Sequence, residues 1–418
     1  MNSESVGFAE VLNSLDVLSP LRDDLLSRYY VDRPGNPFPE MLVSLRASAS
    51  DTKILFSGSR GSGKTTELIR LSEALQDQYF VVFFDTAVSV DPSKVDYVQL
   101  LFGLTLQVYK SAAEQRVKLR QRVAEDLYDL VTIATVAEEK KRNRQVEVNA
   151  ELNAQVAKLT GTLGLGSGRA KTITRQLEPR VAEIIEKFNN LIEEVTKKTK
   201  KRVLVIVDGL DRASPQVQTD LFLRYGEALY SPKCHIVYVV APSLLYERNT
   251  SAIKYAVSAH YRLPNFQVVK RSGRSDTTGR RLLREIVERR VGDGLFSKSA
   301  LDDIVIHSGG IVRELLWLAR EALVRAEHEG SNQVNLGHAR EAIKRMRRNF
   351  SCMLRQDDLA LLSTMVTTGI APRTEITKSL IANQCILELE DGLGVWHIVH
   401  PILTAVVEQY LGKSKGVQ

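Results

Sequence analysis

The pattern of a phosphate-binding loop, G-x-x-x-x-G-K-[ST], matches residues 58–65, which read GSRGSGKT, at every fixed position. Glycines let such a loop turn tightly and direct successive backbone N–H groups at phosphate oxygens. We expect Lys64 to reach the β- and γ-phosphates of a nucleotide and the hydroxyl of Thr65 to ligate Mg²⁺. The nucleotide-binding residues predicted in this part of the chain are Gly58, Gly61, Ser62, Gly63, Lys64, Thr65 and Thr66.

Two acids accompany an apolar, β-branched run at residues 202–208 (RVLVIVD), which is typical of a central parallel strand. Asp208 ends the run at the rim of the sheet where ligands bind, so we expect it to hold Mg²⁺. Asp211, three residues later, could polarise an attacking water or cap the next helix. Ser243 follows another apolar run, and it could either sense the γ-phosphate or form a plain turn.

Four apolar runs must position these residues, at 53–57, 80–85, 202–208 and 235–241. A helix that leaves the loop at residue 66 would add its positive N-terminal end to the phosphate site. Because the runs alternate with helices, the sequence predicts an α/β fold, a doubly wound parallel sheet carrying a P-loop.

The chain divides into four predicted parts. Residues 1–50 form an N-terminal segment, and residues 51–270 form the P-loop core with a helical insertion at about 100–200. An apolar stripe predicts a helical lid over residues 271–350. Helical segments followed by a hairpin make residues 351–418 resemble a winged helix.

The insertion carries two patterns that leave alternatives open. An a/d seam over residues 177–195 predicts a long helix, which could pack on a partner helix of the insertion or grip another protein. Apolar residues alternate over 146–156, which is typical of a strand, but a helix containing alanine would fit as well.

The phosphate loop, the acids at 208 and 211 and the run Gly309-Gly310-Ile311-Val312-Arg313 together resemble AAA+ ATPases. The resemblance is greatest to the origin-recognition type and its signal-transducing STAND relatives. It implies that Arg313, in the lid, contacts the nucleotide as sensor 2. A Gly-Gly helix start with a surface arginine is the alternative.

The same resemblance indicates which residues would contact the purine ring of the nucleotide. Tyr30 and Arg33 lie about where these families cover the adenine, and either side chain could stack on a purine or pack against the sheet. The chain has no guanine-binding signature, so ATP with Mg²⁺ is the predicted cofactor pair.

One departure from the family concerns catalysis. Gly209 stands where typical AAA+ motors carry a glutamate base, and the acid at 211 resembles the STAND arrangement, which favours a slow switch over a fast motor. Arg248 and Arg262 lie near the place of an arginine finger, but each could be an ordinary surface residue.

Charge and composition limit the possible partners and cellular location of the protein. The net charge is +7, and the basic surplus lies in residues 104–202 and 262–290, whereas residues 356–418 are net acidic. These basic regions could contact nucleic acid or be solvated helix faces. No apolar run is long enough to span a membrane, the N-terminus shows no secretion signal, and the three cysteines share no metal spacing, so we expect a cytoplasmic protein.

The leading hypothesis is an ATP-binding, slowly hydrolysing switch that forms homo-oligomers and signals to a partner protein through the insertion or the tail. By resemblance, such switches act in bacterial stress or antiviral defence. The alternatives are a nucleic-acid-associated AAA+ ATPase, such as a DNA loader or transposition regulator, and a nucleotide-binding scaffold without turnover. All three require Lys64 and Asp208 to converge on one magnesium–triphosphate.

Overall fold

The computed structural model describes residues 7–89, 91, 94–135, 152, 156, 168–247, 253 and 256–415. The chain forms two compact units. We call Phe38–Ser57 and Leu68–Arg262 the sheet unit, and Met1–Pro37, Gly58–Glu67 and Leu263–Gln418 the lid unit. This division cuts across the four segments expected from the sequence, whose boundaries stay predictions.

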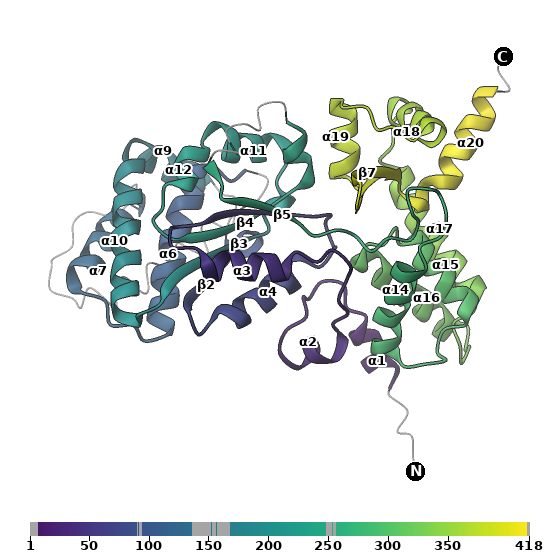
Figure 1. Cartoon of the computed structure of the whole chain (residues 1–418), viewed down its shortest axis with the longest axis horizontal. Helices are drawn as coiled ribbons and strands as arrows, with labels where there is room; N and C mark the ends of the chain where they lie inside the picture. Colours follow the sequence, from purple (N-terminus) through teal and green to yellow (C-terminus); the bar gives the residue numbers. More distant parts are fainter. Residues whose placement is uncertain are drawn as a thin grey trace, which may run out of the picture. The chain divides into compact units, whose positions relative to one another are not determined.

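A five-stranded parallel sheet, in the order β2-β3-β4-β1-β5, forms the centre of the sheet unit (Figure 1). Its strands are β1 (Lys53–Ser57), β2 (Tyr79–Asp85), β3 (Arg202–Asp208), β4 (His235–Val240) and β5 (Ala259–Arg262). The four predicted strands are confirmed. The fifth was missed because its sequence, AHYR, is short and polar and its side chains are at most half-buried.

Strand order places the two halves of the expected site at one edge of this sheet. Strand β4 lies between β1 and β3, and both pairings are parallel, with Ser57 opposite Val240 and Val207 opposite Tyr238. The carboxyl ends of β1 and β3 therefore share an edge. The first leads into the phosphate loop, and the second ends at Asp208.

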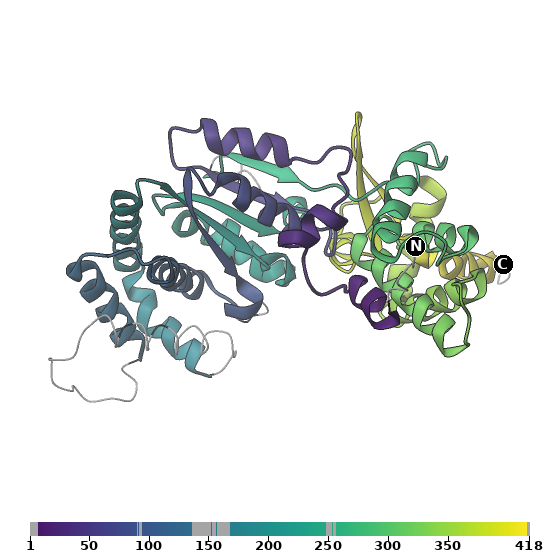
Figure 2. The ribbon, with the colours of Figure 1, turned by 90° about the horizontal axis from the view of Figure 1, so that it is seen from below.

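Helices cover both faces of the sheet (Figures 1 and 2). Helices α3 and α4 lie on one face, and α6 and α12 lie on the other. The helices and helical turns of this layer are α3 (Phe38–Ala47), α4 (Lys64–Leu75), α5 (Thr86–Ser89), α6 (Tyr97–Glu114), a 3₁₀ turn (Leu210–Arg212), α11 (Pro215–Thr219), a π-helical turn (Asp220–Arg224), α12 (Gly226–Tyr230) and a 3₁₀ turn (Pro242–Tyr246).

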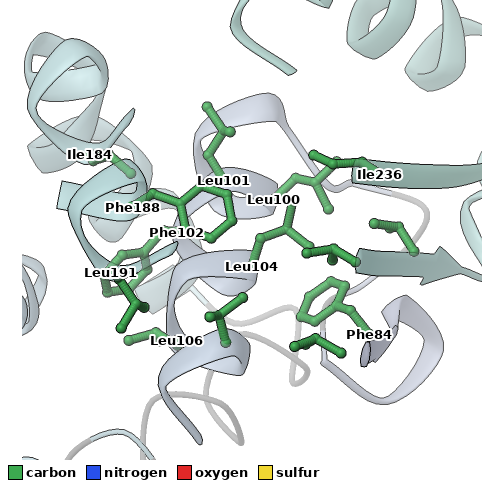
Figure 3. Packing of buried hydrophobic residues seen from close by; sticks show 14 of the residues in the cluster. Phe84, Leu100, Leu101, Phe102, Leu104, Leu106, Ile184, Phe188, Leu191 and Ile236 are labelled. Atoms are coloured by element: carbon green, nitrogen blue, oxygen red, sulfur yellow. The ribbon is translucent and has the colours of Figure 1, made fainter. Parts of the chain in front are cut away.

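The insertion is helical, as expected. It consists of α6, α7 (Gln121–Thr135), α9 (Gly168–Leu177), a 3₁₀ turn (Glu178–Arg180) and α10 (Val181–Thr199). The predicted seam lies along α10, where Ile184, Phe188 and Leu191 are fully buried in the same core cluster as α6 and α7 (Figure 3). The seam is therefore occupied within the insertion, and the idea that it grips a partner protein is wrong.

Most of the alternating run at 146–156 lies outside the described residues. Leu152 and Val156, which are described, are both helical and buried. At these two positions the structure agrees with the helical alternative.

The region expected to form a helical lid is helical, and it contains α14 (Thr277–Val291), α15 (Lys298–His307), α16 (Val312–His328) and α17 (Leu336–Ser351). Two N-terminal helices, α1 (Phe8–Ser14) and α2 (Asp23–Tyr29), contact them. Their main chain is held by arginines of the lid: the guanidinium of Arg320 donates to the Leu12 carbonyl at 2.8 Å, and that of Arg289 donates to the Tyr30 carbonyl.

The C-terminal segment, residues 356–415, completes the lid unit. The predicted hairpin is confirmed as an antiparallel pair whose two-residue turn lies between Asp391 and Gly394 (Figure 2). The winged-helix assignment stays a prediction. The elements of this segment are α18 (Gln356–Thr368), α19 (Glu375–Ala382), β6 (Ile386–Asp391), β7 (Gly394–Val399), a 3₁₀ turn (Pro401–Leu403) and α20 (Thr404–Lys415). Among the described residues, no helix is both long and apolar enough to cross a membrane.

Candidate nucleotide site

The phosphate loop adopts a backbone that requires glycine. Gly61 and Gly63 have φ values of +82° and +102°, in the left-handed region that side chains rarely enter. A Cβ atom on Gly61 would also lie 2.6 Å from the Cβ of Arg313, which is too close for any side chain. The glycines are therefore needed both for the turn and for the close approach of α16.

Lys64 starts helix α4 and turns back over the loop. Its Nζ donates to the carbonyls of Gly58, at 2.8 Å, and Ser59, at 2.9 Å. Only 5% of the residue is exposed, so its charge is held close to the loop backbone. Such an ammonium group lies where phosphate oxygens bound to the loop amides would need a counter-charge.

The next three carbonyls of the loop are each held by a donor from a distant part of the lid unit. The donors are a side-chain amide of the C-terminal segment, a backbone N–H at the start of α16 and a guanidinium of the N-terminal segment. The pairs are Gln384 Nε2 with Arg60 O (2.6 Å), Arg313 N with Gly61 O (3.1 Å) and Arg33 Nη2 with Ser62 O (2.6 Å).

This arrangement fixes the direction of the loop amides. A trans peptide is planar, so its C=O and the following N–H point in opposite directions. Because the carbonyls of residues 60, 61 and 62 face these donors, the N–H groups of Gly61 and Gly63 face the other way, whereas the Ser62 N–H donates to the Ser59 carbonyl at 3.1 Å. Successive amides that point into one concavity form an anion site.

Arg33 is the buried member of this set. Its Nη1 donates to the Pro264 carbonyl at 2.9 Å, and its guanidinium lies 4.5 Å from the centre of the Phe266 ring. Burial lowers the pKa of the guanidinium, and the nearby Glu67 carboxylate opposes that shift. The structure therefore places Arg33 behind the phosphate loop, with Phe266 against its flat face.

Tyr30, the second residue expected near the base, lies at the start of α4. Its hydroxyl donates to the Glu67 carboxylate at 2.9 Å, and the side-chain amide of Asn36 donates to the same hydroxyl at 3.0 Å. The ring is half-buried. Contact between Tyr30 and a purine stays a prediction.

Arg313 holds the loop through its backbone N–H, and the base of its side chain packs against Gly61. Its Nε donates to the Val17 carbonyl at 3.3 Å. The preceding Gly309 and Gly310 have φ values of +61° and +84°, and a Cβ on Gly310 would lie 1.7 Å from the Phe266 carbonyl. The double glycine thus lets α16 start beside the phosphate loop, and the sensor 2 role of the guanidinium stays a prediction.

The acids of the sheet unit form a second cluster, the carboxylate corner (residues 208–213). Asp208 is buried at the end of β3, and the N–H of Gly209 donates to its Oδ1 at 2.8 Å. Gly209 has φ +88°, which strains any other residue. This left-handed backbone explains why position 209 carries glycine and not the glutamate of typical AAA+ motors.

Asp211 lies half-buried in the 3₁₀ turn that follows. The alternative that it caps the next helix is wrong, because Ser214 is the N-cap of α11 and accepts the Val217 N–H. Ser243 lies just past β4, and its Oγ is buried without a hydrogen-bond partner. A buried hydroxyl left in this way fits the predicted contact with phosphate or its water.

Gln218 is a structural residue of this corner that the sequence did not reveal. It is buried on α11, where its Nε2 donates to the Ala213 carbonyl at 3.1 Å and its Oε1 accepts the Ala241 N–H at 2.8 Å. One amide thus ties the turn after β3 to the end of β4. No local pattern marks such a residue, since it looks like any polar position of a short helix.

The oxygen donors of the two clusters suit magnesium. Mg²⁺ prefers one or two hard protein oxygens and completes its shell with water and phosphate. The Thr65 hydroxyl and the Asp208 carboxylate are such groups. Thr65 and Lys64 belong to the lid unit and Asp208 to the sheet unit, so their convergence on one ion stays a prediction.

Comparison with known proteins supports the fold. Residues 39–231 match the sequence model of the KAP family P-loop domain. No curated protein is matched by this sequence. The family match, the parallel sheet and the loop between β1 and α4 show a P-loop NTPase fold, as predicted.

Several solved structures are similar over almost the whole chain. Cdc6p from Pyrobaculum aerophilum has 12% identity and a TM-score of 0.42, covering 95% of this chain and 100% of that chain. A Walker-type ATPase of Pyrococcus abyssi has 14% identity and a TM-score of 0.49, with coverages of 94% and 99%. The ORC1 protein of Aeropyrum pernix, in complex with DNA, has 14% identity and a TM-score of 0.40, with coverages of 95% and 95%. At these scores the similarities establish no function for this chain.

Proposed function

We propose that this protein binds ATP with Mg²⁺ at the phosphate loop, hydrolyses it slowly and works as a nucleotide-dependent switch. The observation that carries the proposal is the direction of the loop amides. Three carbonyls are held outward by Gln384, Arg313 and Arg33, which directs the N–H groups of Gly61 and Gly63 into the cradle, while the Ser62 N–H closes the loop on the Ser59 carbonyl. A triphosphate is the ligand that such a cradle with a buried lysine suits best.

Magnesium would be held by Thr65 and Asp208, and it would neutralise charge on the β- and γ-phosphates. Slow turnover follows from the carboxylate corner. The left-handed backbone at Gly209 excludes a glutamate base, so the half-buried Asp211 is the acid left to orient or deprotonate water. ATP is preferred to GTP because the sequence lacks a guanine signature.

The signalling role is supported by the way in which the loop is held. Its donors come from the N-terminal segment, from α16 and from the C-terminal segment, so a nucleotide that moves the loop must act on all three. Formation of homo-oligomers, transmission to a partner protein and a place in bacterial stress or antiviral defence are proposed from the resemblance to STAND ATPases.

The nucleic-acid alternative rests on the basic surplus of residues 104–202 and 262–290. Within the described residues, many of these cations are already in ion pairs, which reduces the charge available to phosphates. For this reason we favour the switch. The pairs are Arg120 with Glu194, Lys187 with Glu183, Arg271 with Asp391, Arg281 and Arg289 with Glu285, and Arg284 with Asp302.

Phosphate release measured with and without short duplex DNA tests the proposal. We expect ATP turnover well below about 1 s⁻¹, the lower end for ordinary enzymes, and no more than a small change with DNA. Mass photometry should show larger assemblies with a non-hydrolysable ATP analogue. A tenfold stimulation by DNA would favour the alternative, binding without turnover would favour a scaffold, and absence of ATP binding would overturn the proposal.

A further inference from the structure

The geometry points to a coupling between the C-terminal segment and the phosphate loop. We propose that Gln384 is a positioning residue for nucleotide binding, so that nucleotide affinity depends on the docking of the C-terminal segment. The inference rests on the proposed function, because it concerns the same loop. Beyond that function, the inference names the C-terminal segment as the part of the chain that regulates the loop, and the Arg60 carbonyl oxygen as the atom through which this segment acts.

Gln384 is held firmly before it reaches the loop. It follows α19 with φ +60°, a left-handed conformation unusual for a residue other than glycine or asparagine. Its N–H donates to Ile381 O at 3.1 Å, and the next residue, the fully buried Cys385, donates to Leu380 O at 2.8 Å. The side chain therefore leaves a fixed turn, and its Nε2 lies 2.6 Å from the Arg60 carbonyl.

The hydrogen bond acts on an amide that would face the ligand. Holding the Arg60 carbonyl outward turns the N–H of Gly61 inward, because the two groups belong to one planar peptide. Without the bond, Gly61 is free to rotate its peptide, since glycine has little conformational preference. Loss of the Gln384 side chain should therefore cost affinity by disordering an amide of the cradle.

A second contact joins the C-terminal segment to the helix that holds the next carbonyl. Nε2 of the fully buried His400 lies 2.7 Å from Oε2 of Glu314, in the first turn of α16. Nδ1 of His400 accepts the Ile402 N–H at 3.0 Å, which fixes the plane of the ring beside the carboxylate. Glu314 directly follows Arg313, whose N–H holds Gly61 O.

The double glycine brings these parts together. A Cβ on Gly309 would lie 2.5 Å from Leu387 Cδ1 and 3.0 Å from His400 Nε2, so only glycine permits this approach. At the hairpin turn, the Arg271 guanidinium donates two hydrogen bonds of 2.9 Å to the Asp391 carboxylate. The C-terminal segment thus contacts the phosphate loop, the start of α16 and the segment between β5 and α14 that contains Arg271.

Coupling between two such sites is reciprocal. If docking of the C-terminal segment orders the loop and raises nucleotide affinity, then bound nucleotide must strengthen docking by the same factor. The segment would then report the state of the site to whatever it touches. This mechanism needs no side chain of the C-terminal segment to contact the nucleotide itself.

Titration of a fluorescent N-methylanthraniloyl-ATP into the full-length protein tests the inference. Gln384→Asn keeps a residue that tolerates the left-handed backbone but shortens the amide out of reach of Arg60. We expect about fivefold weaker binding, the change that corresponds to loss of one hydrogen bond of about 1 kcal/mol. Gln384→Lys keeps a long donor and should restore most of the affinity. Asn383→Ala, whose amide bonds to Ser379 within α19, is the matched control and should bind like the wild type.

Hydrogen exchange of the nucleotide-free protein gives a readout independent of ATP. Peptides covering residues 58–63 should exchange faster in Gln384→Asn than in the wild type or Asn383→Ala, while peptides of β3 stay unchanged. If neither loop exchange nor affinity changes in Gln384→Asn, the inference is overturned. If the wild type binds no ATP but the exchange difference is present, the role of Gln384 in ordering the loop is upheld and the proposed function fails.

Discussion

The phosphate loop and the carboxylate corner are supported in different ways. The loop receives donors from Arg33, Arg313 and Gln384, which span most of the chain. The corner is held from within the sheet unit: the Gly209 N–H donates to Asp208, the Thr86 hydroxyl donates to the Asp208 carbonyl at 2.8 Å, and Gln218 joins the turn to the end of β4. Both carry groups expected at one nucleotide, but the donors described for the loop come from three separate segments of the lid unit.

The difference assigns separate tasks to the two clusters. A cluster held by the sheet and the turns at its strand ends stays in place when the segments of the lid unit move. A loop held by three distant segments changes when any one of them changes. We infer that the corner supplies constant chemistry and that regulation acts on the loop.

The largest expected effect comes from Lys64→Ala. This substitution removes the buried ammonium group beside the Gly58 and Ser59 carbonyls, and with it the counter-charge of the phosphates. Binding of ATP should fall by about a hundredfold, since a charge-assisted contact contributes up to about 3 kcal/mol. Isothermal titration calorimetry measures it, and thermal unfolding serves as the folding control. Near-normal affinity would show that the loop is not the site.

Asp211→Asn should separate chemistry from binding. The substitution keeps the size of the side chain but removes the carboxylate that could act as a base, so turnover should fall by about a hundredfold. Affinity for ATP should stay within about twofold, because the loop is unchanged. Single-turnover phosphate release gives the rate. Unchanged turnover would remove Asp211 from the catalytic role and leave the corner a structural element.

Arg33→Lys should weaken the loop from its other side. Lysine keeps the charge, but it lacks the fork that reaches both Ser62 and Pro264, and it stacks less well on Phe266. We expect about tenfold weaker ATP binding with turnover of the bound complex nearly unchanged. The split between KM and kcat in steady-state assays is the measurement. A fall in kcat alone would contradict a purely positioning role.

The smallest effect concerns the amino edge of the sheet. Burial, with Arg202 nearby, lowers the pKa of His235 to about 4, and its Nδ1 accepts the Thr52 N–H. The folded state thus requires the neutral ring. Its contribution to stability is complete above about pH 6.5, the ordinary value, and is lost as the pH falls toward 4.

Urea unfolding followed at pH 7.5, 6 and 5 measures this contribution. The wild type should lose on the order of 1 kcal/mol more than His235→Gln by pH 5, after allowance for solvent screening. Gln keeps an acceptor for Thr52 and does not titrate. Parallel pH profiles of the two proteins would mean that another group controls acid stability. Exchange of the loop peptides should not follow this pH profile.

Local sequence patterns predicted the parts that are locally determined. The loop motif, the run ending at Asp208 and the hairpin at 386–399 each carry their signal within a few residues, and the structure agrees with all three elements. The strand at 259–262 was not predicted because a strand at the edge of a sheet needs few hydrophobic residues. Its partner β1 lies two hundred residues earlier in the chain, and pairing over that distance leaves no periodicity to detect.

The residues that support the site were harder to foresee. Gln384 and Gln218 act through amides that any polar surface position could carry, and their importance lies in which backbone atoms they meet. Arg33 was expected near a base, but its guanidinium is buried behind the loop. Tertiary packing, not local composition, decides these roles.

The contact between the C-terminal segment and the loop uses a main-chain oxygen of Arg60, whose side chain is exposed. Every amino acid offers the same oxygen at that place. This hydrogen bond therefore sets no requirement on the side chain at position 60. Searches for covarying positions would miss this connection, and only a perturbation of the donor itself can expose it.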